Sequence, residues 1–211
     1  MIISHRHKFI FFAVPKTATH TIREALRQHL GPDDWEQQVL FGSQSLPIPE
    51  IAALRHGHIT AQELRPHLDP GIWRDYFKFG FVRNPFDRFV SVCFFLHRDD
   101  PGFAAAATTV MKERLARKRF RQRVLVRPQH LQLCDENSDI ALDFVGRYEA
   151  LQQSYDAICE QIGVPRSALG LRNTSDHASY LDYYRDDALR RQVGEFYAED
   201  LRLFSYPAEP A

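Results

Sequence analysis

The feature that most constrains the fold is a short apolar run near the start of the chain, which ends in a polar turn. Residues 8–14 have the sequence KFIFFAV and stop at Pro15, and an aromatic-rich run of this length predicts a buried strand. From Thr21 the apolar residues recur at helical spacing until Gly31 and Pro32 end the pattern. The chain therefore opens with a strand, the polar turn PKTATHT and a helix.

A second unit of the same kind occupies residues 75–98. The segment DYFKFGFV at 75–82 predicts a second buried strand, which Arg83 follows. Asn84 and Pro85 then predict the start of a helix, because Asn caps a helix end and Pro fits the first turn. Two strands, each followed by a turn and a helix, favour a parallel arrangement.

The remaining segments extend this alternation. Residues 31–50 contain three Pro and two Gly without a clear period, so they predict a loop. A short helix is expected after Thr60, with Glu63 at the capping-box position. Further helices are expected at 103–119 and 186–203, and IALDFVGRYEAL at 140–151 predicts a third strand leading into a helix. We therefore expect one domain, residues 1–211, with a three-layer α/β/α fold around a central, mainly parallel sheet.

Composition and charge exclude several classes of protein. Apolar residues make up 44% of the 211 residues, enough to fill a core, so a largely disordered chain is excluded. Lys and Arg number 27, as do Asp and Glu, so nothing favours a protein that coats nucleic acid or a membrane surface. The longest apolar run, residues 9–14, is far shorter than the roughly 20 residues of a membrane span. We expect a soluble, cytoplasmic protein without an export signal.

The cysteines give no sign of a metal site or a disulfide framework. Cys93, Cys134 and Cys159 are widely spaced and form no CxxC pair. Neither a set of disulfides nor a cysteine zinc site is supported by this spacing. We therefore expect three reduced thiols and no bound metal.

The PKTATHT turn has the chemistry of an anion site. A turn between a buried strand and a helix N-terminus presents backbone N–H groups and the positive end of the helix dipole. Lys16 adds a full positive charge, and Thr17, Thr19 and Thr21 add hydroxyl groups. The turn differs from the GxxxxGK[ST] loop of ATP and GTP hydrolases, because its Lys comes first and it contains no Gly.

A second group for anions follows the second strand, in RNPFDRFVS. Arg83 directly follows the strand, and Ser91 lies two turns into the next helix. In a parallel sheet the two strand ends share one edge, where ligands bind. We therefore expect both groups to serve one ligand.

The two segments resemble the PKTG[ST]-type and RNPxxRxVS-type motifs of sulfotransferases, in particular the carbohydrate sulfotransferases called sulfotransferase family 2. Segments 127–135, 143–158 and 180–204 also resemble this family, so the likeness spans most of the chain. The resemblance implies a P-loop-like nucleotide-binding fold and transfer of a sulfuryl group from 3′-phosphoadenosine 5′-phosphosulfate to a hydroxyl. It implies 3′,5′-adenosine bisphosphate as a product, a carbohydrate as the acceptor, and no metal.

The resemblance also implies roles for individual residues. The 5′-phosphosulfate would be surrounded by Lys16, Thr17, Ala18, Thr19, His20 and Thr21. Arg83 and Ser91 would bind the 3′-phosphate, for which the planar guanidinium is well suited. Ala18 stands where the family commonly has Gly, and His20 where it commonly has Ser or Thr.

The acceptor hydroxyl needs a base, and HGH at residues 56–58 is the first candidate. His-x-His in an extended segment places both imidazoles on one face, and an imidazole of pKa about 6.5 takes a proton at neutral pH. The segment resembles the HGH of animal uronic-acid 2-O-sulfotransferases, which implies that His58 is the base, with His56 beside it. His130 in RPQH is the second candidate and could instead hold substrate. A surface pair without a role and a pair of zinc ligands stay open.

Three rival functions are weighed against sulfotransfer. A small-molecule or sugar kinase using ATP and magnesium is disfavoured by the displaced Lys and by Arg83 in place of an acidic metal ligand. A nucleotide- or glycan-binding module that has lost catalysis is disfavoured by the presence of Lys16 and a candidate base. Binding of a polyanion through the basic run at 112–123 is compatible with enzymatic activity, although a solvated helix face is the favoured interpretation of that run.

Overall fold

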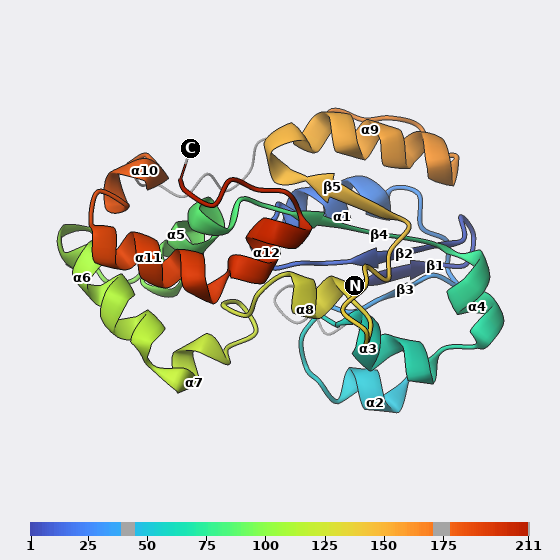
Figure 1. Cartoon of the computed structure of the whole chain (residues 1–211). Coiled ribbons are helices and arrows are strands. Elements are labelled where there is room, and N and C mark those ends of the chain that lie inside the picture. The colour runs from blue at the N-terminus through green and yellow to red at the C-terminus, as the bar shows by residue number, and fades with distance from the viewer. Residues whose placement is uncertain (39–44, 171–177, 211) are drawn as a thin grey trace. The chain divides into compact units, whose positions relative to one another are not determined.

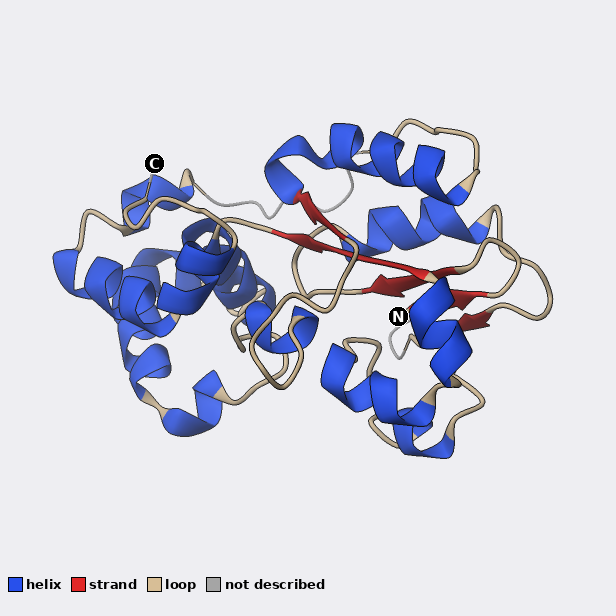
Figure 2. Ribbon diagram, turned by 45° about the vertical axis from the view of Figure 1, so that its right-hand side comes forward, coloured by secondary structure: helices blue, strands red, loops and turns tan. Residues whose placement is uncertain are grey.

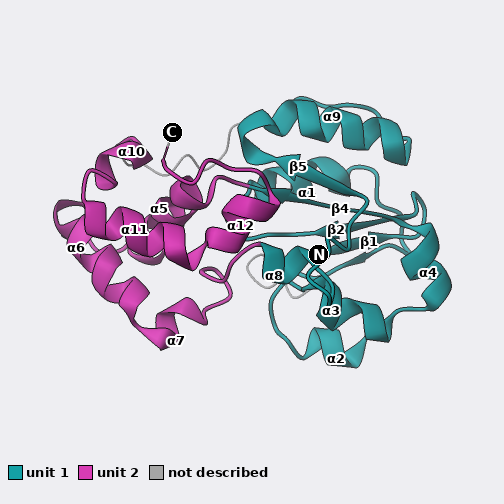
Figure 3. Ribbon diagram, in the orientation of Figure 1, with its two compact units in different colours: residues 1–82, 130–172 teal, residues 83–129, 173–211 magenta. Residues whose placement is uncertain are grey.

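The computed structural model describes residues 1–38, 45–170 and 178–210 of the chain. By its internal contacts the chain divides into two compact units, which Figure 3 colours separately. Unit 1 comprises Met1–Val82 and His130–Arg172, and unit 2 comprises Arg83–Gln129 and Asn173–Ala211. The assignment of all 211 residues to one domain stays a prediction.

Unit 1 is built on a five-stranded sheet of order β3-β1-β2-β4-β5. Its strands are β1 (Ile2–Ser4), β2 (Phe9–Phe12), β3 (Trp35–Glu36), β4 (Phe77–Val82) and β5 (Phe144–Arg147). The strands β2, β4 and β5 pair in parallel, whereas β1 is antiparallel to both of its neighbours. Because β3 opposes β1, four of the five strands run in one direction, and the expected mainly parallel sheet is confirmed.

One face of this sheet carries the main hydrophobic core. The helices α1 (Thr19–Arg27) and α9 (Leu151–Ile162) lie along it, on one side of the strands in Figures 1 and 2. Alternate strand residues such as Phe11 and Phe79 are fully buried against the apolar residues of both helices. Every residue of β2 is buried, and alternate residues face this core because successive strand side chains point to opposite faces of the sheet.

The opposite face of the sheet is covered by short helices, which completes the three layers within unit 1 (Figure 2). These are α2 (Pro49–Ala52), α3 (Ala61–Leu64), η1 (Arg65–His67), α4 (Pro70–Asp75) and α8 (His130–Leu133). Trp73 of α4 contacts Phe12 edge-on, with ring centroids 6.3 Å apart. A Cβ added to Gly80 of β4 would lie 3.2 Å from a methyl carbon of Leu133, so α8 packs closely on this face.

Unit 2 is helical in its described part. Its helices are α5 (Pro85–Leu96), α6 (Phe103–Ala116), α7 (Lys118–Arg121), α10 (Tyr180–Tyr183), α11 (Asp187–Phe196) and α12 (Ala198–Leu203). Tyr184 joins α5 to the later helices by donating its hydroxyl to the carbonyl of Phe86 at 2.8 Å. Across the described residues of the whole chain, no helix is both long and apolar enough to cross a membrane.

The short elements are where the sequence interpretation needs correction. The loop predicted at 31–50 contains β3 and the start of α2, and its residues 39–44 lie outside the described part of the chain. The predicted helix at 103–119 ends at Ala116, because Arg117 adopts an extended backbone before α7 begins. The capping box of Thr60 and Glu63 is confirmed, with the Thr60 side chain accepting from the Glu63 N–H at 3.0 Å.

Candidate functional site

The PKTATHT turn connects β2 to α1 through two residues with left-handed backbone. Lys16 has φ +67° and Ala18 has φ +60°, and Thr17 lies between them. Left-handed residues within a turn direct successive backbone N–H groups toward the same concave side. Backbone N–H groups arranged in this way bind anions. Thr17 is fully buried and donates its hydroxyl to the carbonyl of Val14 at 3.0 Å, which closes the turn. The turn is thus shaped by its backbone for a negatively charged group.

The helix that follows leaves its N-terminus available to such a group. Ala18 is the N-cap of α1, and its methyl side chain cannot accept a hydrogen bond from the first turn. The first N–H groups of a helix have no acceptor within the helix, and the dipole places partial positive charge there. Exposure alternates along the turn: Lys16, Ala18 and His20 are partly exposed, and Thr17, Thr19 and Thr21 are buried.

The pKa of His20, at the start of α1, is lowered, which favours the neutral ring. Burial lowers the pKa of its imidazole, and the positive charges of Arg23 and Lys16 lower it further. A neutral ring can donate or accept one hydrogen bond at each nitrogen according to its tautomer. The positive charge next to the turn is therefore that of Lys16.

His58 is fixed against the end of β2 by a hydrogen bond to the backbone. Its Nδ1 lies 2.6 Å from the carbonyl oxygen of Ala13. Because a carbonyl oxygen only accepts, Nδ1 carries the proton and Nε2 of the neutral ring holds the lone pair. Ala13 precedes Lys16 by three positions, so the strand end that begins the turn also holds this imidazole.

The environment of His58 keeps its ring unprotonated. Burial, the largest cause, lowers the pKa of His58 to about 3, the hydrogen bond to Ala13 opposes this shift, and the nearby charges of Arg23 and His56 add to it. The ring of His56 is inclined by 30° to that of His58, with 6.5 Å between the centroids. The segment bends at residues 56 and 57, so the expectation of an extended HGH segment is wrong, although the two rings do lie side by side.

The site includes three buried side chains that the sequence interpretation missed. Arg23 donates to the carbonyl of Gly57, Gln37 donates to that of His56, and Gln132 donates to those of Ala13 and Ile59. Each of the three is less than 8% exposed. His130 begins α8 two positions before Gln132, and it is Gln132 whose described contacts reach the strand end that holds His58.

The second motif begins unit 2. Asn84 caps α5 by accepting from the N–H of Phe86 at 3.0 Å, and Pro85 takes the first position, as predicted. Arg83 is 9% exposed, and Ser91 is buried on α5. Nε and Nη2 of Arg83 contact the two carboxylate oxygens of Asp87 at 2.8 and 2.7 Å. A carboxylate therefore already lies against the guanidinium that was expected to bind phosphate.

The basic run, also in unit 2, is a solvated surface. Exposed cations at the end of α6 and on α7 are Arg117, Lys118, Arg119, Arg121 and Arg123. None of these five is ion-paired with a carboxylate of the described residues, whereas Lys112 pairs with Asp186 at 2.6 Å. The favoured interpretation of the run is confirmed, and polyanion binding stays a prediction.

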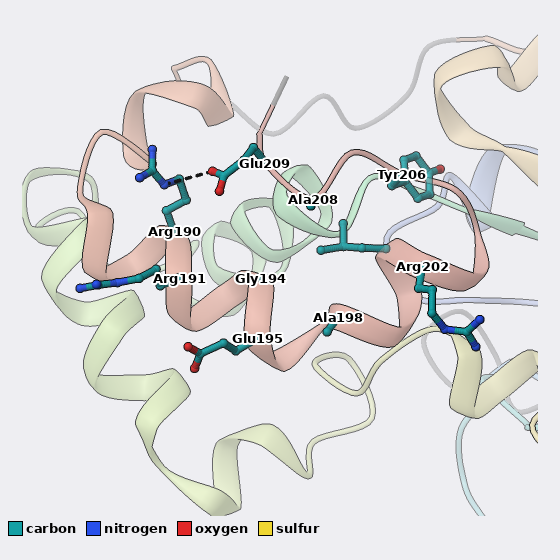
Figure 4. A pocket seen from close by; sticks show the side chains of 10 residues that line it. Arg190, Arg191, Gly194, Glu195, Ala198, Arg202, Tyr206, Ala208 and Glu209 are labelled. Atoms are coloured by element: carbon teal, nitrogen blue, oxygen red, sulfur yellow. Dashed lines mark ion pairs between the residues drawn. The ribbon is translucent and has the colours of Figure 1, made fainter.

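Unit 2 also has an open cavity of about 460 Å³ beside α11 and α12 (Figure 4). Its lining includes Arg190, Arg191 and Arg202 and the buried side chains of Leu201 and Tyr206. Arg190 is ion-paired with Glu209 at 3.1 Å. None of the candidate site residues from the sequence lines this cavity.

The residues that the structure describes contain no cluster of three His, Cys, Asp or Glu side chains able to hold a metal ion.

A comparison of the sequence with models of protein families found a match to the sulfotransferase family, which covers residues 1–207 of the chain. Comparisons with curated proteins and with solved structures gave no match.

Proposed function

From the premise that the chain belongs to the sulfotransferase family, we propose that it transfers a sulfuryl group from 3′-phosphoadenosine 5′-phosphosulfate to a hydroxyl of a carbohydrate. The observation that carries this proposal is the hydrogen bond of 2.6 Å between His58 and Ala13. It joins a candidate base to the strand end from which the PKTATHT turn begins. A base and a cradle for an anion are the two parts that sulfuryl transfer to a hydroxyl requires.

The residues of unit 1 fit the donor's phosphosulfate. The backbone of Lys16 and Ala18, the uncapped start of α1 and the Lys16 ammonium all favour a multiply charged anion. The donor supplies a sulfuryl group whose bond to the bridging oxygen of the 5′-phosphate breaks. We assign to Lys16 the neutralisation of the charge that collects on that oxygen, because electrostatic stabilisation of developing charge is the largest contribution in such reactions.

His58 acts on the acceptor. Its Nε2 takes the proton of the acceptor hydroxyl while the acceptor oxygen forms its bond to sulfur, and the bond from sulfur to the bridging oxygen breaks. The products are the sulfated acceptor, 3′,5′-adenosine bisphosphate and a proton that leaves from His58. A pKa of about 3 makes His58 a weak base before substrates bind, and the negative charge of the bound donor raises that pKa toward the value a base needs.

Arg83 and Ser91 of unit 2 are proposed to bind the 3′-phosphate. The assignment rests on the RNPFDRFVS motif and on the geometry of a planar guanidinium, which binds phosphate through two parallel hydrogen bonds. The contact of Asp87 with Arg83 fixes the orientation of the guanidinium. A bound phosphate would share Arg83 with this carboxylate.

The acceptor class rests on the HGH resemblance, and the donor is tested first. Thermal unfolding is measured with 3′,5′-adenosine bisphosphate, with ADP, and with ATP plus magnesium, for the wild type and Arg83→Ala. A ligand at 100 times its dissociation constant adds about 2.7 kcal/mol, or roughly 5–11 °C for a domain of this size. A shift with the bisphosphate that Arg83→Ala loses supports the donor.

Transfer is then measured with sulfur-labelled donor and a panel of neutral and acidic oligosaccharides. Label on an oligosaccharide, absent with His58→Asn, supports the full proposal. A thermal shift only with ATP and magnesium would favour the kinase instead. Binding of the bisphosphate with no transfer to any hydroxyl compound would favour the non-catalytic binding module.

A further inference from the structure

Arg23 is a buried cation on the helix that follows the PKTATHT turn. Only 4% of its surface is exposed. Its Nη1 donates to the carbonyl of Gln37 at 3.1 Å and its Nη2 to the carbonyl of Gly57 at 3.3 Å, and Nη1 lies 3.5 Å from a carboxylate oxygen of Glu36. A buried guanidinium needs such partners, because an uncompensated buried charge is strongly destabilising.

Gly57 lies in direct contact with that guanidinium. A Cβ added at this position would lie 2.6 Å from Nη2 of Arg23 and 2.3 Å from the carbonyl oxygen of Gln37. Side chains do not approach backbone this closely, so position 57 accepts only glycine in the present arrangement. The carbonyl of Gly57 also accepts from the Met1 amine at 2.8 Å, so Arg23 is one of two donors that hold the HGH backbone.

The peptides on both sides of His58 are held in the same manner. Gln37 donates its Nε2 to the carbonyl of His56 at 2.9 Å, and Gln132 donates its Nε2 to the carbonyl of Ile59 at 3.2 Å. The imidazole itself is bonded to Ala13. Among these supports Arg23 alone comes from α1, the helix whose N-terminus forms part of the proposed donor site.

We propose that Arg23 is a positioning residue for His58, which ties the HGH segment to helix α1 and so keeps the base at a fixed distance from the PKTATHT turn. This inference rests on the proposed function. It adds that the geometry of the base relative to the donor is set by a guanidinium that contacts neither substrate. Displacement of a reacting group by about 1 Å can lower a rate by about 100-fold, so such a support affects turnover directly.

The chain offers a matched control in Arg27. Arg27 lies one turn further along α1 and binds the same carboxylate, with Nε 2.7 Å from Glu36 Oε2. It is more exposed than Arg23 and donates to Glu36 and Gln38, and its described contacts do not include residues 56–58. Arg23→Lys and Arg27→Lys each keep the positive charge and lose the planar guanidinium, but only the first removes the Nη2 donor to Gly57.

The test measures kcat, KM, bisphosphate affinity and the His58 imidazole in the wild type and both variants. We expect Arg23→Lys to lower kcat by about 10- to 100-fold, as misplacement of a reacting group does, with bisphosphate affinity within about twofold of the wild type. We expect Arg27→Lys to keep the wild-type kcat. The ¹⁵N spectrum of the imidazole should show a proton on Nδ1 in the wild type and a changed His58 signal in Arg23→Lys alone.

The outcomes separate this inference from the function it rests on. A wild type that transfers no sulfate overturns the proposed function, and the His58 signal still decides whether Arg23 positions the ring. An unchanged kcat and an unchanged His58 signal in folded Arg23→Lys overturn the inference, as does an equal loss of kcat in Arg27→Lys. If Arg23→Lys does not fold, Arg23→Gln removes the guanidinium without leaving a buried charge, and the same results are expected of it.

Discussion

Two nitrogens of the Arg83 guanidinium contact the carboxylate of Asp87, at 2.8 and 2.7 Å, one turn apart at the start of α5. The side chains are only 10% and 16% exposed, so solvent screens the pair weakly. Asp87 thus orients the guanidinium and also neutralises the charge that a phosphate would use. These two effects on phosphate binding oppose each other, and an isosteric substitution separates them.

Asp87→Asn should tighten the binding of 3′,5′-adenosine bisphosphate roughly three- to tenfold, because it removes a negative charge beside the proposed phosphate site and keeps one acceptor for Arg83. Isothermal titration calorimetry measures the affinity. Asp182→Asn is the control, because Asp182 is an exposed partner of Arg185 in the same unit and outside the motif. Weaker binding in Asp87→Asn would mean that orientation outweighs charge at this site.

Ala18→Gly should stabilise the protein. A left-handed backbone costs a residue with a Cβ about 1 kcal/mol more than it costs glycine, and Ala18 has φ +60° and ψ +30°. We expect a rise of roughly 2–4 °C in the midpoint of thermal unfolding. The control is Ala25→Gly on the same helix, where the backbone is helical and the same substitution should lower the midpoint by a similar amount. A decrease for both variants would contradict the strain assigned to Ala18.

His58→Asn should lower kcat by about 10²- to 10⁴-fold, the usual contribution of a general base. Asparagine places an amide N–H near the position of Nδ1, so the bond to Ala13 can persist while the basic nitrogen is lost. Bisphosphate affinity should stay unchanged. His130→Asn, measured beside it, tests the second candidate: a larger loss there than in His58→Asn would move the role of the base to His130.

The sequence predicts the parts of this fold that local patterns encode. The buried strands β2 and β4, the Asn84 cap and the Thr60 capping box were all recognisable from residue types at fixed spacing. Strands of two or three residues, such as β1 and β3, show no period. These strands form because they pair with neighbouring strands, and a local sequence pattern does not reveal such pairing.

Buried polar residues are the main part of the site that the sequence did not predict. Arg88 of α5 is fully buried and donates to the carbonyls of Leu125 and Arg127. Arg23 shares the apolar stripe of α1 with Ile22 and Leu26, and an arginine in such a stripe was the available signal of burial. Gln132 gave no signal, because its acceptors lie 73 and 119 positions away.

The low pKa of His58 predicts a specific loss of stability in acid. The folded protein holds this ring neutral, with a pKa of about 3, whereas an unfolded chain protonates it at about pH 6.5. The unfolded state therefore binds more protons between these values, so the contribution of His58 to stability is present above pH 6.5 and is lost as the pH falls toward 3.

Urea unfolding of the wild type and of His58→Asn from pH 7 to pH 4 measures this contribution. The free energy of unfolding should fall more steeply with decreasing pH in the wild type than in the variant, because asparagine does not titrate. His20, His29 and His97 also have lowered pKa values through burial, but they are present in both proteins and cancel in the difference. Equal slopes would mean that His58 is protonated in the folded protein as readily as in the unfolded chain, and that its ring is not held on Ala13 in the neutral form.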